Sequence, residues 1–502
     1  MTKKNHKNPR VIMQLCDQQG GYAGITQESQ HLFSAFLDET TLQTTGLIVK
    51  DKAYCLRRGA KNTLARSKVK HLSDYIIHYQ QDNMNNKIKP SLSDLCRLPF
   101  DILSINCRTT LGGLLSLNDF ESKGLEHFLW DVFFSKTLNS SEFTKIVNAS
   151  FRTLRCPHNL LHLAGLMAIA YPKLDTREYD IFLTQMPFPA RVTKNTTLIV
   201  RYHDAIPILA PHLICHPKYH QSFHYNALKA NAKKGFFACS SNASRNDLLH
   251  IKPELENRSI VIHDLVSEAY YPEEYSRHSL QDILLTRALK TEPYAGILPR
   301  DGSPSLPYLL MVSTIEPRKN HIRLIEAWEM LRLSMSTPLK LIIVGKLGWN
   351  YLPILEKIKP WQEQGEIAHL HQIQTSELRF LYQNAACVVC PSLMEGFDLT
   401  GIEAMLCGGK VAASKIPVHR EIYGDAAIYF DPYSVEAQRN AIECIILPDQ
   451  KDLATTLSAR GLQWGKRYQR QVILPQWQHL FKTIHADQDH PSKDKNAKPY
   501  II

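Results

Sequence analysis

The chain has 502 residues, more than one hydrophobic core usually supports, so at least two domains are expected. Hydrophobic residues make up 44% and charged residues 21% of it, as in an ordinary soluble globular protein, and no stretch approaches the roughly eighteen consecutive apolar residues of a transmembrane helix. The net charge of +11 favours anionic partners such as nucleic acid, anionic lipid or phosphorylated small molecules.

The chain opens with a basic, polar segment, residues 1–10, which is predicted to be a disordered tail. A short strand is predicted at Val11–Cys16, followed by a turn that contains Gly21 and Gly24 and by a helix that begins near Thr26. A strand, a glycine turn and a helix N-terminus together let a phosphate or another ligand approach the backbone. The two glycines are therefore candidate site residues, and a tight turn without a ligand is the alternative.

Further apolar runs in the first half alternate with helical stretches, which predicts a mainly parallel sheet with helical crossovers over residues 11–274. The predicted strands are Asp101–Cys107, Ile181–Met186, Leu198–His203, Phe236–Ser240 and Ser259–His263. The stretch Leu125–Leu138 is predicted to be a helix with two apolar faces, as in a core or interdomain helix. A helix that contacts an acceptor or a membrane is the alternative.

Residues 275–307 contain prolines and glycines without a clean hydrophobic period, which predicts an interdomain linker with a helix at Leu280–Leu289. From Tyr308 on, strands and helices alternate regularly, so residues 308–470 are predicted to form a second doubly wound domain. Its predicted strands are Tyr308–Ser313, Leu339–Gly345, Ile367–Ile373, Cys387–Cys390, Lys410–Ala413 and Ala427–Phe430. Its predicted helices are His321–Leu333, Leu352–Ile358, Ser376–Asn384 with Ser376 as N-cap, and two that begin at Leu399 and Ser434.

The chain is predicted to end with a helix at residues 471–486, which packs back on the first domain, and with a disordered tail at residues 487–502. The tail contains Asp487-Gln488-Asp489, the one Asp-x-Asp of the chain, and in this polar setting it is interpreted as chance. No other spacing of acids, histidines and cysteines points to a metal site, so neither a metal nor another cofactor is expected.

Eleven cysteines are scattered mostly singly through apolar segments, which favours free thiols in a reducing cytosol. The N-terminus has no apolar signal region, so a cytoplasmic protein is expected. The chain has no module that interleaves aromatic and basic residues, so nucleic acid is not an expected partner.

Glu395 and Glu403 lie eight positions apart, just beyond the apolar run 386–390, the first in a Glu-Gly-Phe turn and the second inside a predicted helix. Ligands of open α/β sheets bind at the carboxyl ends of strands, over helix N-termini. At this spacing one carboxylate stands in the turn and the other about one helical turn along, so both can face one ligand. A sugar nucleotide suits such a site, because it has hydroxyls at both ends and a diphosphate between them. Solvated or helix-capping glutamates are the alternative.

Arg318 and Lys319 follow the first strand of the second domain, in a turn whose backbone is fixed by Pro317. Two cations near a helix N-terminus can hold a diphosphate and stabilise the charge of a departing nucleoside diphosphate. In the first domain, His203 ends a predicted strand and is expected to face the interdomain cleft, while Asp204 orients its ring or caps the next segment. A solvated basic turn and a packed histidine are the alternatives.

These segments resemble family 4 of the retaining glycosyltransferases, which have the GT-B fold: two Rossmann-like domains that face each other across a deep cleft. The most specific match is Glu395-x7-Glu403 within EGFDLTGIEAMLCGG, and IEPRKN, RYHD, SNASRNDL and GDAAIYFDP resemble further signatures of the family. The resemblance is strongest from Tyr308 to Pro432 and weaker over residues 11–16, 20–37 and 198–263, whereas residues 49–179 are matched by position alone.

The resemblance implies a role for each candidate residue. The donor sugar would be held by Glu395 and by the backbone amides of Gly396, Phe397, Asp398 and Leu399, and the ribose by Glu403. Arg318 and Lys319 would bind the diphosphate, His203 would lie beside the reacting sugar, and the loop with Gly21 and Gly24 would approach the donor phosphate or the acceptor. Such enzymes usually need no metal and retain the anomeric configuration, by a front-face displacement in which the leaving phosphate helps to deprotonate the acceptor.

The sequence departs from the family pattern at Asp398 and Ser313, where glycines are usual, at Thr400, which replaces a common proline, and at Lys410, which follows Gly408-Gly409 where Gly-x-Pro is more usual. A carboxylate about 4 Å from a diphosphate costs roughly 4 kcal/mol at an effective dielectric of about 20, unless it points away or meets a hydroxyl or a cation. Because the glutamate pair and the cation pair are intact, an active enzyme is expected.

The expected function is transfer of a hexose from a nucleoside diphosphate sugar to a glycan or lipid-linked glycan, in the synthesis of surface polysaccharide or lipopolysaccharide. The Glu-Pro-Arg-Lys-Asn segment resembles that of bacterial O-antigen mannosyltransferases, which implies mannose as the hexose. The basic surface favours peripheral contact with anionic lipid at the inner face of the cell membrane. The alternative is a catalytically weakened relative that acts as a nucleotide- or glycan-binding subunit.

Overall fold

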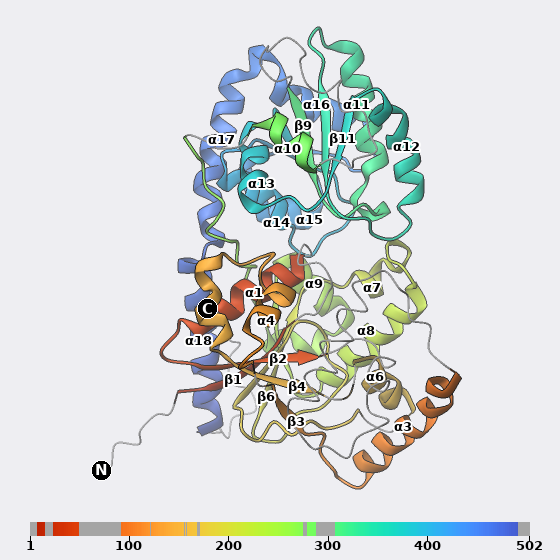
Figure 1. Ribbon diagram of the computed structural model, residues 1–502, viewed down its shortest axis with the longest axis vertical. Coiled ribbons are helices and arrows are strands. Elements are labelled where there is room, and N and C mark those ends of the chain that lie inside the picture. Colours follow the sequence, from red (N-terminus) through yellow and green to blue (C-terminus); the bar gives the residue numbers. More distant parts are fainter. Residues whose placement is uncertain are drawn as a thin grey trace.

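The computed structural model describes residues 8–15, 24–49, 92–120, 122–154, 156, 158–167, 171–274, 279–287 and 307–489. Figure 1 shows two domains stacked along the longest axis of the molecule, each a sheet flanked by helices. The N-terminal domain is the lower one and the C-terminal domain the upper one. None of the helices in these ranges combines the length and apolar character that crossing a bilayer requires.

The N-terminal domain contains an eight-stranded sheet of order β3-β4-β2-β1-β5-β6-β7-β8, in which only β3 is antiparallel to its neighbour. Its strands are β1 (Arg10–Leu15), β2 (Gln43–Val49), β3 (Leu117–Phe120), β4 (Ser150–Leu154), β5 (Ile181–Thr184), β6 (Thr197–Tyr202), β7 (Phe236–Cys239) and β8 (Ser259–Val261). The strand order reverses between β1 and β5, and a crevice forms at such a point, outside the carboxyl ends of the strands.

The helices of this domain are α1 (Gly24–Leu37), α3 (Leu92–Thr110), α4 (Glu126–Phe133), α5 (Phe143–Val147), α6 (His158–Met167), α7 (Ile206–Leu209), α8 (Pro217–Asn231) and α9 (Asn242–Ile251), with short 3₁₀ turns at Ser140–Glu142, Pro211–Leu213 and Pro253–Arg258. Within α4, Leu129, Trp130 and Phe133 are buried in the core that α1 also joins. The aromatic stretch is therefore a core helix, and it ends before the predicted boundary at Leu138.

The strand predicted at Asp101–Cys107 is wrong, because these residues lie inside helix α3. Ile102 and Ile105 are three positions apart, which puts them on one face of a helix, and both pack in a small cluster with Leu160 and Ala164 of α6. The sheet is instead completed by β2, β3 and β4, none of which was predicted.

The C-terminal domain contains a six-stranded parallel sheet of order β11-β10-β9-β12-β13-β14, which reverses between β9 and β12. Its strands are β9 (Tyr308–Val312), β10 (Lys340–Val344), β11 (Ile367–Leu370), β12 (Cys387–Cys390), β13 (Val411–Ser414) and β14 (Ala427–Phe430). Its helices are α10 (Leu280–Arg287), α11 (His321–Ser334), α12 (Leu352–Glu363), α13 (Thr375–Asn384), α14 (Leu399–Leu406), α15 (Pro417–Tyr423), α16 (Val435–Ile446) and α17 (Lys451–Gly465), with 3₁₀ turns at Pro317–Lys319, Gly424–Ala426, Pro448–Gln450 and Lys466–Tyr468. Every strand predicted for this half is present.

Two details of the predicted second half are corrected. Helix α13 begins at Thr375 and its N-cap is Gln374, not Ser376. The Gln374 N–H donates to the carboxylate of Glu377 at 2.7 Å, which forms part of a capping box. Helix α15 was not predicted, because its short apolar face carries little periodic signal.

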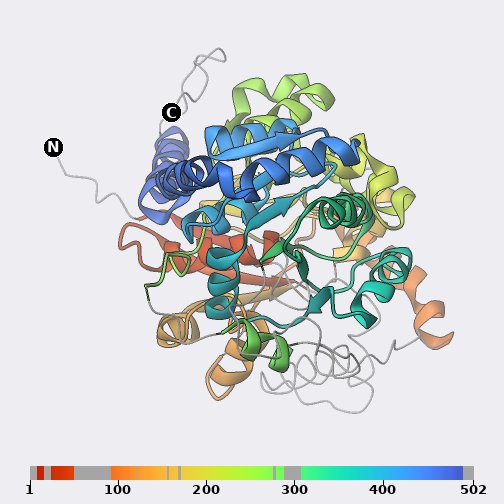
Figure 2. The same cartoon turned by 90° about the horizontal axis from the view of Figure 1, so that it is seen from above.

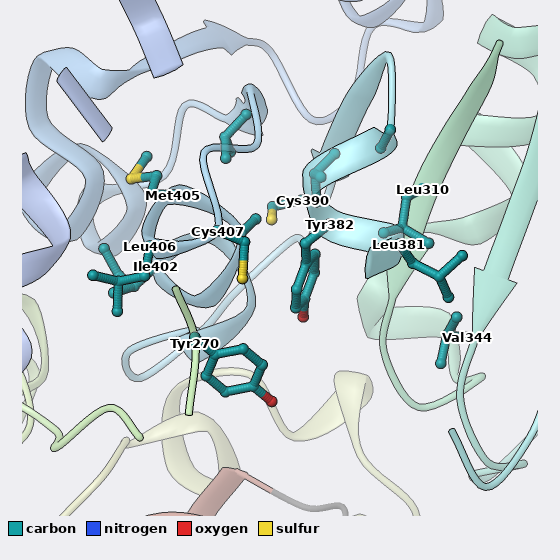
Figure 3. Close-up of a cluster of buried hydrophobic side chains, with 14 of the residues drawn as sticks. Tyr270, Leu310, Val344, Leu381, Tyr382, Cys390, Ile402, Met405, Leu406 and Cys407 are labelled. Atoms are coloured by element: carbon teal, nitrogen blue, oxygen red, sulfur yellow. The ribbon is translucent and has the colours of Figure 1, made fainter. Parts of the chain in front are cut away.

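The chain enters the core of the C-terminal domain earlier than the predicted boundary at residue 274. Val266 and Tyr270 are buried in that core, and so are three apolar residues of α10, which was assigned to the linker. Figure 3 shows Tyr270 beside Tyr382 of α13 and near Ile402, Met405 and Cys407 of the next helix and its end. The other residues of the predicted linker, apart from Ser279 and Pro307, lie outside the described ranges.

After α17 the chain returns to the N-terminal domain as α18 (Arg470–Asp489), which continues past the predicted end at residue 486. Trp477 is fully buried there, and its ring centroid lies 5.9 Å from that of Phe36 on α1. Figure 1 shows α18 beside α1, and in Figure 2, from above, it is seen nearly end-on at the edge of the molecule. The N-terminal core is therefore closed by the far end of the chain.

Gly401 on α14 provides a test of this packing. A Cβ atom at this position would meet the ring of Tyr423 at 2.3 Å. Gly401→Ala is therefore expected to lower the free energy of unfolding by about 1–3 kcal/mol, although alanine is the better helix former. Chemical denaturation measures the loss, and in a Tyr423→Leu background the same change should cost less, because the ring is absent. An equal cost in both backgrounds would contradict the contact.

Candidate functional site

A cavity of about 1070 Å³ lies between the two domains, where the carboxyl ends of both sheets meet. Residues at or after the strand ends of both domains contribute to its lining, among them those that follow β6, β9, β10 and β12. The candidate residues brought together in its wall are Gly24, His203, Arg318, Lys319, Glu395, Gly396, Phe397, Asp398, Leu399 and Glu403. Gly21 lies outside the described residues.

The turn after β9 is bonded directly to the loop after β12, which is the reversal point of the C-terminal sheet. Glu395 forms ion pairs with both Arg318, at 2.7 Å, and Lys319. Burial raises the pKa of Glu395, but the neighbouring charges of Arg318 and Lys319 lower it by more than burial raises it. This pKa therefore lies below its ordinary value. The carboxylate is therefore ionised and fixed between two cations at neutral pH.

Arg318 and Lys319 differ in how they use their donors. Arg318 also bonds to Glu316 at 2.8 Å and to the backbone carbonyl of Met394 at 2.7 Å, so most of its N–H groups serve the loop itself. Lys319 has three N–H donors, and its pair with Glu395 uses one of them. Lys319 can therefore meet a bound anion more directly than Arg318.

Glu403 stands on α14 and is buried, yet it lines the cavity. The Tyr382 hydroxyl donates to its carboxylate at 2.9 Å, and Tyr270 also hydrogen bonds to it. Burial raises the pKa of Glu403 to about 7, against the opposing effect of these hydroxyls. Unlike Glu395, this acid is close to changing its charge at neutral pH.

Asp398 has a hydrogen-bonding neighbour, His419, that bears on the predicted repulsion. It is the N-cap of α14, with a left-handed backbone at φ 70°, and its Oδ2 lies 3.0 Å from Nε2 of His419. The other ring nitrogen of His419 lies 3.0 Å from the carbonyl oxygen and 2.9 Å from the hydroxyl oxygen of Ser414, so the ring is held at both nitrogens. Burial raises the pKa of Asp398, but the hydrogen bond with His419 and the nearby charge of Lys319, with smaller contributions beside them, together outweigh burial, and this pKa lies well below its ordinary value.

His203 lies at the end of β6, with its Nε2 3.4 Å from the side-chain oxygen of Gln185 and its Nδ1 4.0 Å from Asp264. Burial and then the nearby cation of Arg201 lower its pKa well below the ordinary value, so the ring is neutral. Asp204 does not orient the ring: its Oδ1 accepts from the N–H of Ile206 at 2.9 Å and caps the next segment.

Several wall residues were missed in the sequence, among them Asp264 after β8, Lys346 after β10 and His371 after β11. Each follows a parallel strand, so the same strand-end rule that singled out His203 points to them too. Lys136, just beyond α4, also reaches the cavity, and no strand end marks it in the sequence.

Residues 302–462 match the family model of glycosyl transferases group 1. The chain is 30% identical over 178 residues to the O-antigen chain mannosyltransferase B of Escherichia coli. This alignment covers 35% of this chain and 46% of that relative. It is 25% identical over 231 residues to the O-antigen chain mannosyltransferase RfbU of Salmonella typhimurium. This alignment covers 40% of this chain and 64% of that relative. In both cases the chain spans less than two thirds of the relative.

Solved structures share the architecture over most of the chain. Sucrose-phosphate synthase of Thermosynechococcus elongatus aligns with a TM-score of 0.57 and 14% identity, over 95% of this chain and 99% of that one. The Anabaena protein HepE in complex with UDP aligns with a TM-score of 0.54 and 14% identity, over 95% of this chain and 100% of that one. At this identity the likeness concerns the fold alone, and the predicted GT-B fold is confirmed.

Proposed function

We propose that this chain, whose residues 302–462 match the family model of glycosyl transferases group 1, transfers a hexose from a nucleoside diphosphate sugar to a glycan. The observation that supports this best is the wall of the interdomain cavity, where Glu395, Lys319 and Glu403 meet on one sheet edge. Two acids and a cation in one wall match a ligand that has hydroxyls at both ends and a diphosphate in the middle.

In this proposal Glu395 and the amides of residues 396–399 hold the hexose, Glu403 accepts from the ribose, and Lys319 with Arg318 binds the diphosphate. The bond between the anomeric carbon and the phosphate oxygen breaks, and the acceptor oxygen bonds to the same face of that carbon. The configuration is retained because attack comes from the face that the phosphate leaves, and the acceptor proton passes to the leaving phosphate. The neutral, buried ring of His203 lies beside the reacting sugar. It carries no positive charge that would oppose the positive charge developing on that sugar.

The named relatives are O-antigen mannosyltransferases, which supports mannose as the hexose and a lipid-linked surface glycan as the acceptor. With a lipid-linked acceptor, the enzyme works in the cytoplasm as a peripheral protein at the inner face of the membrane, which the net charge of +11 favours. The runner-up is a nucleotide- or glycan-binding subunit without transfer activity, and the feature in its favour is the ionised carboxylate of Asp398 within residues 395–399, which would repel a diphosphate.

The experiment is a thermal-shift screen of nucleoside diphosphate hexoses, followed by transfer to a lipid-linked glycan with the best of them. A donor at a hundred times its Kd should stabilise the fold by about 2.7 kcal/mol. NMR of the product should then show a retained anomeric configuration. Stabilisation by a donor without hydrolysis or transfer would support the binding subunit, and no stabilisation by any donor would contradict both hexose transfer and nucleotide binding.

The charge of Glu403 predicts how donor affinity changes with pH. Ribose hydroxyls donate to the ionised carboxylate, whereas the free protein has a pKa of about 7 at this group. Binding therefore favours loss of the proton, and donor affinity should rise with pH from about 6 to about 8, by up to roughly tenfold per unit below the pKa. Calorimetric titration measures this, and Glu403→Gln should bind more weakly without the slope. Affinity that falls as pH rises would contradict the role of Glu403.

A further inference from the structure

The segment Ser240 to Leu248, which carries the SNASRNDL signature, has no part in the donor contacts described so far. Ser240, Ser241 and Ser244 lie between the end of β7 and the first turn of α9, and all three are buried. Their hydroxyls converge on two backbone carbonyls, one from each domain. Those carbonyls belong to His203 and to Gly396, two residues of the cavity wall.

Two of the three hydroxyls lie within hydrogen-bond distance of both carbonyl oxygens, and the third lies close to one of them. The hydroxyls of Ser240 and Ser244 lie 2.8 Å and 2.7 Å from the oxygen of His203, and 3.1 Å and 3.2 Å from that of Gly396. The hydroxyl of Ser241 lies 2.9 Å from the oxygen of Gly396. Three hydroxyl protons are therefore shared between two carbonyl oxygens, which together have four lone pairs.

The two carbonyl segments are also in direct contact. A Cβ atom at Gly396 would lie 2.2 Å from the carbonyl oxygen of His203, so only glycine allows this approach. The donor loop, residues 395–399, is thus held against the strand end that presents His203. Because these residues come from different domains, the contact exists only while the domains keep this relative position.

A fourth side chain crosses the same boundary a short distance away. Glu421 on α15 of the C-terminal domain accepts from the N–H groups of Asn242 and Ala243 at 2.7 Å and 3.0 Å. It thereby caps the N-terminus of α9 in the N-terminal domain, and it also pairs with His263 at 3.1 Å. A carboxylate that caps a helix of the other domain adds to the stability of this arrangement.

We propose that Ser240, Ser241, Ser244 and Glu421 form an interdomain clasp that sets the position of His203 relative to the donor loop. The inference rests on the proposed function, because its consequence is the alignment of the acceptor side with the donor sugar. The four side chains are positioning residues. Transfer depends on the geometry of the reacting atoms, and a displacement of about 1 Å costs roughly 10²-fold in rate.

The test uses the double variant Ser240→Ala/Ser244→Ala in the full chain. Its kcat for hexose transfer should fall by about tenfold or more, whereas KM for the donor should change little, because the donor contacts lie within the C-terminal domain. Ser434→Ala is the matched control: it removes a half-buried hydroxyl that caps α16 within the C-terminal domain, where the hydroxyl accepts from the N–H of Ala437 at 3.0 Å. Unchanged kcat in the double variant, or an equal fall in the control, would overturn the clasp.

Small-angle X-ray scattering separates the clasp from the proposed function. The triple variant Ser240→Ala/Ser244→Ala/Glu421→Gln should have a larger radius of gyration than the parent chain at an unchanged helix content. If the parent chain transfers no hexose from any donor, the proposed function fails and the scattering still decides on the clasp. Identical scattering of the parent and the triple variant would overturn it.

Discussion

Glu395→Gln is expected to lower kcat for hexose transfer by roughly 10²- to 10³-fold, the size of effect seen when one preorganised group at a reacting centre is removed. Glutamine keeps the shape of the side chain but removes the charge that two half-buried cations share. Without it, Arg318 and Lys319 repel each other, the donor loop loses its fixed position, and the sugar loses a strong hydrogen-bond acceptor. Donor hydrolysis without acceptor should fall with transfer.

Glu316→Gln is the matched control for this variant. Glu316 lies in the same cavity wall and pairs with Arg318 at 2.8 Å, but its contacts lie within the turn after β9 and it has no assigned contact with the sugar. Its removal should lower kcat by less than tenfold, or roughly 1.4 kcal/mol. Transfer by Glu395→Gln at the parent rate, or equal losses in the two variants, would contradict the assignment of Glu395 to the sugar.

Lys319→Ala is expected to lower kcat/KM for the donor by about 10²-fold, or roughly 2.7 kcal/mol. The lysine has donors left after its pair with Glu395, so its charge can meet the diphosphate both in the bound donor and as negative charge builds on the leaving group. Both KM and kcat should therefore respond. Steady-state kinetics with the preferred donor measures the two separately.

A comparison of the affinities for a nucleoside and for its diphosphate isolates the role of Lys319. The variant should bind the diphosphate more weakly than the parent but the nucleoside equally well, because the nucleoside carries no charge for the lysine to meet. Arg323→Ala is the control cation, since Arg323 bonds to Asn320 outside the cavity. A loss of nucleoside affinity as large as the loss for the diphosphate would contradict a phosphate contact.

The C-terminal domain could be predicted from its sequence because its strands are short, apolar and completely buried, as in Cys387–Cys390. Strand ends of such a sheet meet on one edge, so Glu395, Arg318 and Lys319 could be expected in one place without knowledge of the connections. The same reasoning could not decide between Arg318 and Lys319. That distinction depends on which of them bonds to Glu316 and Met394, and the sequence does not specify these contacts.

The N-terminal domain was less predictable, because a short apolar run fits a strand or a helix equally well. Asp101–Cys107 was assigned to the wrong element for this reason, and β2 and β4 were missed. The partner of Asp398 also could not be found, since His419 is 21 positions away and lies on the unpredicted helix α15. Long-range polar pairs leave no local pattern in a sequence.

The most direct test is a crystal structure of the chain with a 2-fluoro analogue of the donor that the thermal-shift screen identifies. The account predicts the ribose at Glu403, the diphosphate at Lys319 and the hexose over the loop from Glu395 to Leu399, with His203 across the cavity from it. A donor bound outside this cavity, or one whose diphosphate does not contact Lys319 or Arg318, would contradict it.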